Sequence, residues 1–238
     1  MTVSNVNEPN YLSSPFVALT SPQTYDVSPT EGLTLKLLPP QGPVTRHENV
    51  NDQLGVGPTL NSTFRVGRGS ITTFEIASST QPGSVIAAIL IDANEDSGDK
   101  VRQDEIDWEL LPGDPEYCQT NLFAPTEADT APHYGVFSGR HDLGKGSTVF
   151  ELHSYSISLF EDKIEWGVDG TTVRTLHKSE SYIDGALHWP RHNFLISLGL
   201  WDGSGATGTS HWAKGPILWE QVTEPIVAHV KKVTVECV

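Results

Sequence analysis

Alternating apolar and polar positions dominate the chain and predict β-strands. The runs are short or β-branched, and turn residues separate them. Because 16 Pro and 21 Gly are scattered over the full length, hardly any window is helix-periodic and free of breakers, so long helices are not expected. The predicted strands cover residues 84–91, 105–110, 118–123, 150–160, 163–168, 171–176, 194–201 and 226–237.

The turns between these runs favour an antiparallel arrangement. Residues 160–163 and 168–171 each lie between alternating runs, and the second turn contains Asp169-Gly170, a pair typical of a tight hairpin. Many short strands over more than 200 residues predict an all-β fold, a β-jelly-roll sandwich of two curved antiparallel sheets with a concave cleft. We expect one domain spanning residues 1–238, with residues 1–30 as an irregular surface segment.

Net charge excludes several partners. The formal charge is -15, from 15 Lys+Arg and 30 Asp+Glu, which argues against nucleic acid and anionic membrane surfaces. The longest apolar run, 85–91, is far shorter than the roughly 20 residues of a membrane-spanning helix, so no membrane span is expected. Residues 1–5 show no secretory signal, which leaves two interpretations open: a mature extracellular form, or a cytoplasmic protein.

Two cysteines and one sequon are candidate modification sites. Cys118 and Cys237 lack the spacing of a zinc site, and they either pair as a disulfide or remain free thiols. Asn61-Ser62-Thr63 is a glycosylation sequon that has meaning only in a secreted protein.

The predicted strand at 105–110 carries a row of carboxylates. Because alternate side chains of a strand share a face, Glu105, Asp107 and Glu109 project together, while Ile106, Trp108 and Leu110 project toward the core. A solvated acidic face is the ordinary interpretation of such a pattern. Three like charges without an interleaved cation are unfavourable, however, and such clusters concentrate at active sites.

Paired carboxyl groups are the machinery of glycoside hydrolysis. A retaining enzyme needs one ionised carboxylate as nucleophile and one protonated carboxyl as acid, about 5 to 5.5 Å apart. Glu105 and Glu109 fit this role only if the strand curves, as it does in a concave sheet. Asp107 between them can share a hydrogen bond with the nucleophile and keep the three charges unequal.

These residues also carry a family resemblance. The strand 104–109 resembles the E-x-D-x-E signature of glycoside hydrolase family 16, and further segments resemble that family in the same order. Within the family, the chain is most similar to the fungal Crh-like transglycosylases, which join chitin to β-glucan. The matching segments are 82–88, Cys118-Gln119-Thr120-Asn121-Leu122-Phe123, 153–157, 164–174, Leu198-Gly199-Leu200-Trp201-Asp202-Gly203 and His211-Trp212-Ala213-Lys214-Gly215.

The resemblance implies roles for individual residues. Glu105 is expected to be the nucleophile, Asp107 the auxiliary carboxylate and Glu109 the general acid/base. Gln119 and Asn121 share one face of the next strand, where they either bind sugar hydroxyls or form a solvated polar face. Trp201 and Trp212 are candidates for stacking on sugar rings, with a core role as the alternative.

Three other motifs are weighed and set aside. Residues 203–208 match G-x-G-x-x-G, but Gly215-Pro216 follows so soon that no helix is expected, and dinucleotide binding is rejected. Residues 92–103 begin like a calcium loop, but Gln103 stands where a bidentate Glu is required. His188 and His192 have metal-ligand spacing, but Pro190 breaks the helix that would align them. We therefore expect neither a metal nor a cofactor.

The sequence thus predicts a retaining glycosidase or transglycosylase on β-linked cell-wall polysaccharide, acting as a monomer outside the cell or in the cell wall. Two alternatives stay open. One is an endo-β-1,3(4)-glucan hydrolase of the same family, and the other is a non-catalytic glycan-binding jelly roll that uses the same sheet.

Overall fold

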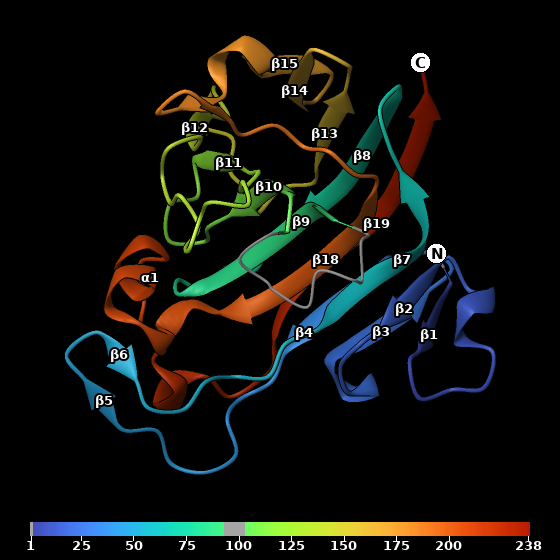
Figure 1. Cartoon of the computed structure of the whole chain (residues 1–238). Coiled ribbons are helices and arrows are strands. Elements are labelled where there is room, and N and C mark those ends of the chain that lie inside the picture. The colour runs from blue at the N-terminus through green and yellow to red at the C-terminus, as the bar shows by residue number, and fades with distance from the viewer. Residues whose placement is uncertain (1, 93–102) are drawn as a thin grey trace.

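The computed structural model describes residues 2–92 and 103–238 and contains two large sheets. The long strands β9, β18 and β7 lie side by side in the first sheet (Figure 1). This eight-stranded sheet has the order β1 (Val3–Asn5), β2 (Phe16–Ala18), β7 (Thr59–Val66), β18 (Phe194–Asp202), β9 (Ser84–Asp92), β10 (Glu105–Leu110), β11 (Tyr117–Phe123) and β12 (Gly139–Asp142).

The second large sheet is seven-stranded and packs on the first across the core. Its order is β15 (Thr171–His177), β14 (Lys163–Val168), β13 (His153–Leu159), β8 (Ser70–Ala77), β19 (Ile226–Cys237), β4 (Gly32–Leu37) and β3 (Tyr25–Ser28). In the part of the chain that the structure describes, the remaining elements are two small hairpins, one α-helix and short 3₁₀ helices. They are β5 (Arg46–His47), β6 (Val50–Asn51), β16 (Tyr182–Ile183), β17 (Ala186–Leu187), α1 (Thr207–Trp212), and 3₁₀ turns at Tyr11–Ser13, Pro22–Thr24, Lys178–Glu180, Gly203–Gly205 and Trp219–Gln221.

Two buried tryptophans tie the sheets together through their indole N–H groups. Trp166 on β14 donates to the backbone carbonyl of Asp107 on β10, at 3.1 Å. Trp108 on β10 donates to the carbonyl of Ser156 on β13, also at 3.1 Å. Both side chains are fully buried, so each indole fills the core while its polar atom is satisfied by the opposite sheet. The centre of β10 is therefore hydrogen-bonded to the seven-stranded sheet. The predicted core position of Trp108 is confirmed.

The strand predictions succeed where alternation is strong. The β10 and β19 bounds match the predicted ranges, and the meander of β13, β14 and β15 forms as the turn residues indicate. The turn between β14 and β15 places Asp169 and Gly170 at φ 49° and 77°, as a tight hairpin requires. Three long strands, β4, β7 and β8, were not predicted. In β7 and β8, polar residues such as Thr and Ser occupy many positions and weaken the apolar alternation, whereas β4 alternates Leu33, Leu35 and Leu37 with polar residues and could have been found.

Two local expectations were wrong. Residues 1–30 are not wholly irregular, because β1, β2 and β3 lie there and extend the edges of both sheets. A helix does begin within residues 203–208: α1 starts at Thr207 and ends at Trp212, before Gly215-Pro216. Six residues suffice for one and a half turns, so the nearby Pro limits the length of this helix but does not prevent it.

The structure decides between the two alternatives for the cysteines. Both thiols are free: Cys118 is buried on β11 in the eight-stranded sheet, and Cys237 is exposed at the end of β19 in the other sheet. Since the two residues belong to different sheets and only one is in the interior, their side chains do not meet. Burial raises the pKa of the Cys118 thiol to about 12, so it stays neutral and unreactive at ordinary pH.

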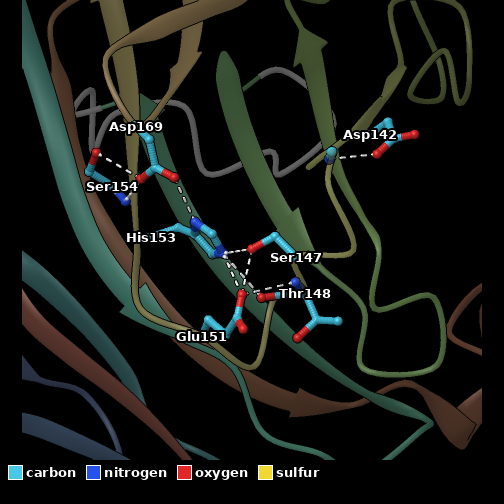
Figure 2. A network of polar contacts seen from close by, with 8 residues as sticks. Asp142, Ser147, Thr148, Glu151, His153, Ser154 and Asp169 are labelled. Carbon is cyan, nitrogen blue, oxygen red and sulfur yellow. Dashed lines mark hydrogen bonds and ion pairs between the residues drawn. The ribbon is translucent and has the colours of Figure 1, made fainter.

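A buried histidine ties the hairpin turn to a neighbouring loop (Figure 2). The Nδ1 atom of His153 lies 2.7 Å from Asp169, whose other oxygen accepts a hydrogen bond from the Ser154 N–H. On the far side of the ring, Nε2 lies 3.1 Å from the Ser147 hydroxyl and 3.2 Å from the Thr148 carbonyl.

The contacts of Ser147, His153 and Asp169 have the order of a nucleophilic triad, but the chemistry differs. The Ser147 hydroxyl donates to the Glu151 carboxylate and not to the imidazole, so its proton is not offered to a base. The network therefore has a structural role: it fixes the loop at 147–151 and the turn at 169–170 to the start of β13.

Replacing the buried His153 with alanine is expected to lower the free energy of unfolding by about 1 to 3 kcal/mol, because the contacts of the imidazole with Asp169, Ser147 and the Thr148 carbonyl are lost. Urea unfolding of the purified chain measures the effect. His47→Ala is the matched control, because His47 is exposed on β5. Equal stability of the two variants would contradict the structural role of His153.

Within the described residues, no helix is long and apolar enough to cross a membrane.

Candidate active site

Strand β10 lies between β9 and β11, well inside the eight-stranded sheet. Its core face is apolar: Ile106, Trp108 and Leu110 are at most 1% exposed. The predicted two-faced strand is therefore confirmed. The carboxylates project from the other face of β10. Residues that are directly paired across neighbouring strands project to the same face of the sheet. The register pairs Glu105 with Phe123, Asp107 with Asn121 and Glu109 with Gln119.

The three carboxyl groups differ in their surroundings. Asp107 is buried, and burial followed by the charges of Glu105 and Glu109 raises its pKa well above the usual range. A protonated Asp107 carboxyl therefore donates a hydrogen bond to Glu105, which opposes the effect of burial on the Glu105 pKa. The middle residue thus keeps a proton, and the Glu105 pKa, which burial raises, is raised less than it would be without this hydrogen bond.

Glu109 is the third group, and among the described residues no hydrogen bond opposes the rise of its pKa. Burial, followed by the nearby charge of Glu105, raises its pKa to about 7. At neutral pH or below, Glu109 therefore holds a proton for a large part of the time, whereas the hydrogen bond from Asp107 favours the ionised form of Glu105 against the effect of burial. Two carboxyl groups whose environments push them to different protonation states are the arrangement from which acid and nucleophile are assigned.

Both glutamates face one open cleft. A cavity of about 620 Å³ is lined by Glu105 and Glu109 together with β11 side chains, α1 and Trp201. A smaller cavity of about 170 Å³ continues past Glu105 beneath the loop that follows β11. The carboxylates therefore lie on the floor of a groove that extends past Glu105, which suits a chain-like ligand.

The structure brings Gln119, Trp201 and Trp212 together at one wall of this groove. The Trp212 indole N–H donates to the Gln119 side-chain oxygen at 2.9 Å. The rings of Trp201 and Trp212 stack with 6.0 Å between centroids and 24° between planes. Both indoles are half-buried and line the larger cavity, so they contribute to its wall and not to the main core.

Asn121 also lines the larger cavity but is more constrained than the sequence suggests. It is buried beside Asp107 on the neighbouring strand, and its Oδ1 atom accepts a hydrogen bond from the Leu122 N–H at 3.0 Å. The side chain is thus fixed in orientation by its own backbone, and a solvated polar face is the wrong description for it.

Two aromatic residues of the cleft were missed in the sequence. Phe123 lies directly opposite Glu105, and Tyr134 is 77% exposed and contacts Phe123 edge to face, with 5.8 Å between centroids. Both line both cavities. Phe123 could have been found, because it continues the alternation of Gln119 and Asn121, whereas Tyr134 lies in a loop without periodicity.

The sequon residue Asn61 lies where glycosylation is unfavourable. It is in the middle of β7, paired with β2 on one side and β18 on the other, and its Oδ1 atom is shielded from solvent. Glycosylation acceptors occupy exposed loops. The sequence interpretation of Asn61 as a candidate acceptor is therefore not supported by its position.

Metal-ligating side chains gather in two places among residues 2–92 and 103–238. One cluster is Asp129, His133 and His188, and the other is Asp92, Asp104 and His192. His188 and His192 thus belong to different clusters, in line with the inference that Pro190 keeps them apart. Apart from Asp92 and Gln103, the calcium-like segment 92–103 lies outside the described residues.

Comparisons with known proteins identify the family of the chain. The family model for "Glycosyl hydrolases family 16" matches residues 15–221. Crh-like protein 5 of Aspergillus fumigatus is 29% identical over 205 residues, covering 83% of this chain and 46% of that protein. The chain therefore spans less than half the length of this curated relative.

Solved structures share the fold. "Crh5 transglycosylase in complex with NAG" superposes with a TM-score of 0.71 at 24% identity, over 97% of this chain and 81% of that one. The laminarinase catalytic domain from Thermotoga maritima MSB8 gives 0.69 at 20% identity, over 90% of this chain and 80% of that one. Because the family model matches most of the sequence, the chain belongs to glycosyl hydrolase family 16, with sequence similarity to the fungal Crh-like proteins.

Proposed function

We propose that the chain is a single catalytic domain that cleaves β-linked cell-wall polysaccharide with retention and passes the released glycosyl unit to an acceptor. The observation that carries the proposal is that Glu105 and Glu109 face one cleft from the same face of β10, where a hydrogen bond from Asp107 favours the ionised form of Glu105 and burial raises the pKa of Glu109 to about 7. A retaining glycosidase needs this division between an ionised nucleophile and a protonated acid.

In the first step, the Glu105 carboxylate attacks the anomeric carbon while Glu109 gives its proton to the departing glycosidic oxygen. A covalent glycosyl–Glu105 ester forms, and Glu109 is left ionised. In the second step, Glu109 takes the proton of the acceptor hydroxyl as that oxygen displaces Glu105. The hydrogen bond from Asp107 holds Glu105 in its reactive orientation and limits the charge on the strand.

Transfer to a second sugar chain is the form of the reaction that we favour, on β-glucan and including chitin-to-glucan transfer. Support comes from the similarity to Crh-like proteins and to a structure named as a transglycosylase. Hydrolysis by an endo-β-1,3(4)-glucanase is the second candidate, and the fold shared with a laminarinase favours it. Both use the same two steps and differ only in whether water is the acceptor.

A non-catalytic glycan-binding protein accounts less well for the site. Three carboxyl groups crowded on one partly buried strand are costly to keep, because burial and mutual repulsion both oppose their ionisation. Sugar hydroxyls can be bound by neutral amides and aromatic rings without that cost. We also propose a monomer that works outside the cell or in the cell wall, where its polysaccharide substrate is found.

Incubation with β-glucan oligosaccharides and labelled chitin or glucan oligosaccharides tests the proposal, with products resolved by size. Labelled products longer than the starting label are expected, since they form only by transfer. Shorter donor fragments without elongated label would indicate the hydrolase. If neither appears while the oligosaccharides bind, the chain is a glycan-binding protein and the proposal fails.

A further inference from the structure

Beside the smaller cavity, two imidazoles and one carboxylate converge from segments that are distant in sequence. Asp129 and His133 lie in the loop between β11 and β12, and His188 lies between β17 and β18. Each offers a ligand atom, and these atoms all lie within 4.8 Å of one another. We propose that Asp129, His133 and His188 form a binding site for a divalent transition metal of the zinc class.

The distances suit a metal after a small side-chain movement. Asp129 Oδ1 lies 2.7 Å from His133 Nε2, and Asp129 Oδ2 lies 3.7 Å from His188 Nδ1. Zinc–nitrogen and zinc–oxygen bonds are about 2.0 to 2.2 Å long, so tetrahedral ligand atoms lie roughly 3.3 Å apart. One observed separation is shorter than this value and the other is longer. Without a metal, Asp129 and His133 contact each other directly.

The carboxylate is held in place by its own loop. The Thr126 N–H donates to Asp129 Oδ2 at 2.5 Å, and the Thr126 hydroxyl donates to the same oxygen at 2.9 Å. A ligating carboxylate is commonly oriented by such hydrogen bonds. His188 is buried, and its Nδ1 lies 3.1 Å from the Ala124 carbonyl, a contact that Nδ1 exchanges for the metal.

The ligand set selects the class of ion. Calcium and magnesium take oxygen ligands almost alone, whereas imidazole favours zinc and its neighbours in the first transition series. Two histidines and one acid also leave one coordination position for water or a substrate oxygen. Since His133 and His188 both line the cavity that Glu105 lines, that position faces the groove.

The consequence would be a cross-link in the wall of the cleft. The metal would join the loop that carries Tyr134 to the segment before β18 and fix the shape of the groove beside Glu105. This inference does not rest on the proposed reaction, because metal binding is measured without substrate.

Cobalt(II) is the probe, because its visible absorption reports both binding and coordination geometry. Titration of the chelator-treated full chain is expected to give one tetrahedral cobalt per chain, which zinc displaces. His133→Ala and His188→Ala should each weaken the cobalt affinity more than tenfold. Removing only a residue that hydrogen-bonds to a metal ligand already lowers metal affinity by about 10- to 100-fold. His133 is partly exposed, so its variant folds; thermal unfolding without metal checks both variants.

His192→Ala is the matched control, because His192 belongs to the other cluster, with Asp92 and Asp104. This variant is expected to keep the wild-type cobalt spectrum and affinity. Loss of the spectrum in His192→Ala with retention in His133→Ala would overturn the proposal. Absence of a stoichiometric tetrahedral spectrum in the wild-type chain would also overturn it. If His188→Ala does not fold, the His133→Ala titration decides.

Discussion

Replacing Glu105 with glutamine is expected to abolish turnover of polysaccharide, with a loss beyond the roughly 10²- to 10⁴-fold that general acid–base catalysis contributes. The amide is nearly isosteric but cannot form the glycosyl ester, so neither hydrolysis nor transfer proceeds. Initial rates on β-glucan oligosaccharides measure the effect. Glu236→Gln is the control, because Glu236 is exposed on β19 in the other sheet and should keep wild-type activity.

The same variant should fold at least as stably as the wild type. Glu105 raises the pKa values of both Asp107 and Glu109 by its charge, so its neutralisation removes repulsion within a partly buried strand. A thermal unfolding midpoint at pH 8 that is unchanged or higher, together with lost turnover, is the expected combination. A variant that retained full activity on every polysaccharide tested would refute the role of Glu105.

Replacing Glu109 with glutamine is expected to remove the alkaline limb of the pH–rate profile. Burial raises the Glu109 pKa from 4.5 to about 7, so the folded protein keeps this proton below pH 7 and loses it above. Bond cleavage needs the protonated form, and the wild-type rate should therefore fall as pH rises through about 7. In the glutamine variant, the rate on oligosaccharides should drop by about 10² to 10⁴ and lose this dependence.

Substrates with different leaving groups distinguish a role of Glu109 as general acid from a general disruption of the site. An aryl glycoside with a strongly acidic phenol departs without a proton, so its cleavage step should survive in Glu109→Gln while natural linkages fail. Burst kinetics with such a substrate measure the step directly. Equal losses on both substrates would show that Glu109 acts by shaping the cleft and not as the acid.

Much of the catalytic strand could be predicted because its pattern is local. Alternation alone indicates which face of residues 105–110 is buried, and the protonation difference follows from three carboxyl groups in a row. The surroundings that set the size of the pKa shifts of these carboxyl groups are not local in sequence. The shifts depend on how deeply Asp107 is buried, and on the partners that β9, β11 and Trp166 bring to it from far along the chain.

The loop residues of the site could not be predicted from the sequence. Tyr134 and the Asp129–His133–His188 cluster have no periodic signal, and their positions follow from where the loop after β11 meets the segment before β18. Helix α1 shows a related difficulty, because tertiary contacts stabilise one and a half turns that propensity does not favour. The sequence leaves the state of the two cysteines open, because spacing in sequence does not tell which sheet a strand joins.

The hydrogen bond from Trp166 to the Asp107 carbonyl has a consequence for how variants are interpreted. Its donor lies on the sheet behind the cleft and faces away from any substrate, yet it sets the position of the backbone between the two glutamates. A substitution at Trp166 would therefore lower the rate constant and leave substrate affinity nearly unchanged. In a mutational screen it would look like an active-site change, although it lies one layer below the sugar-binding surface.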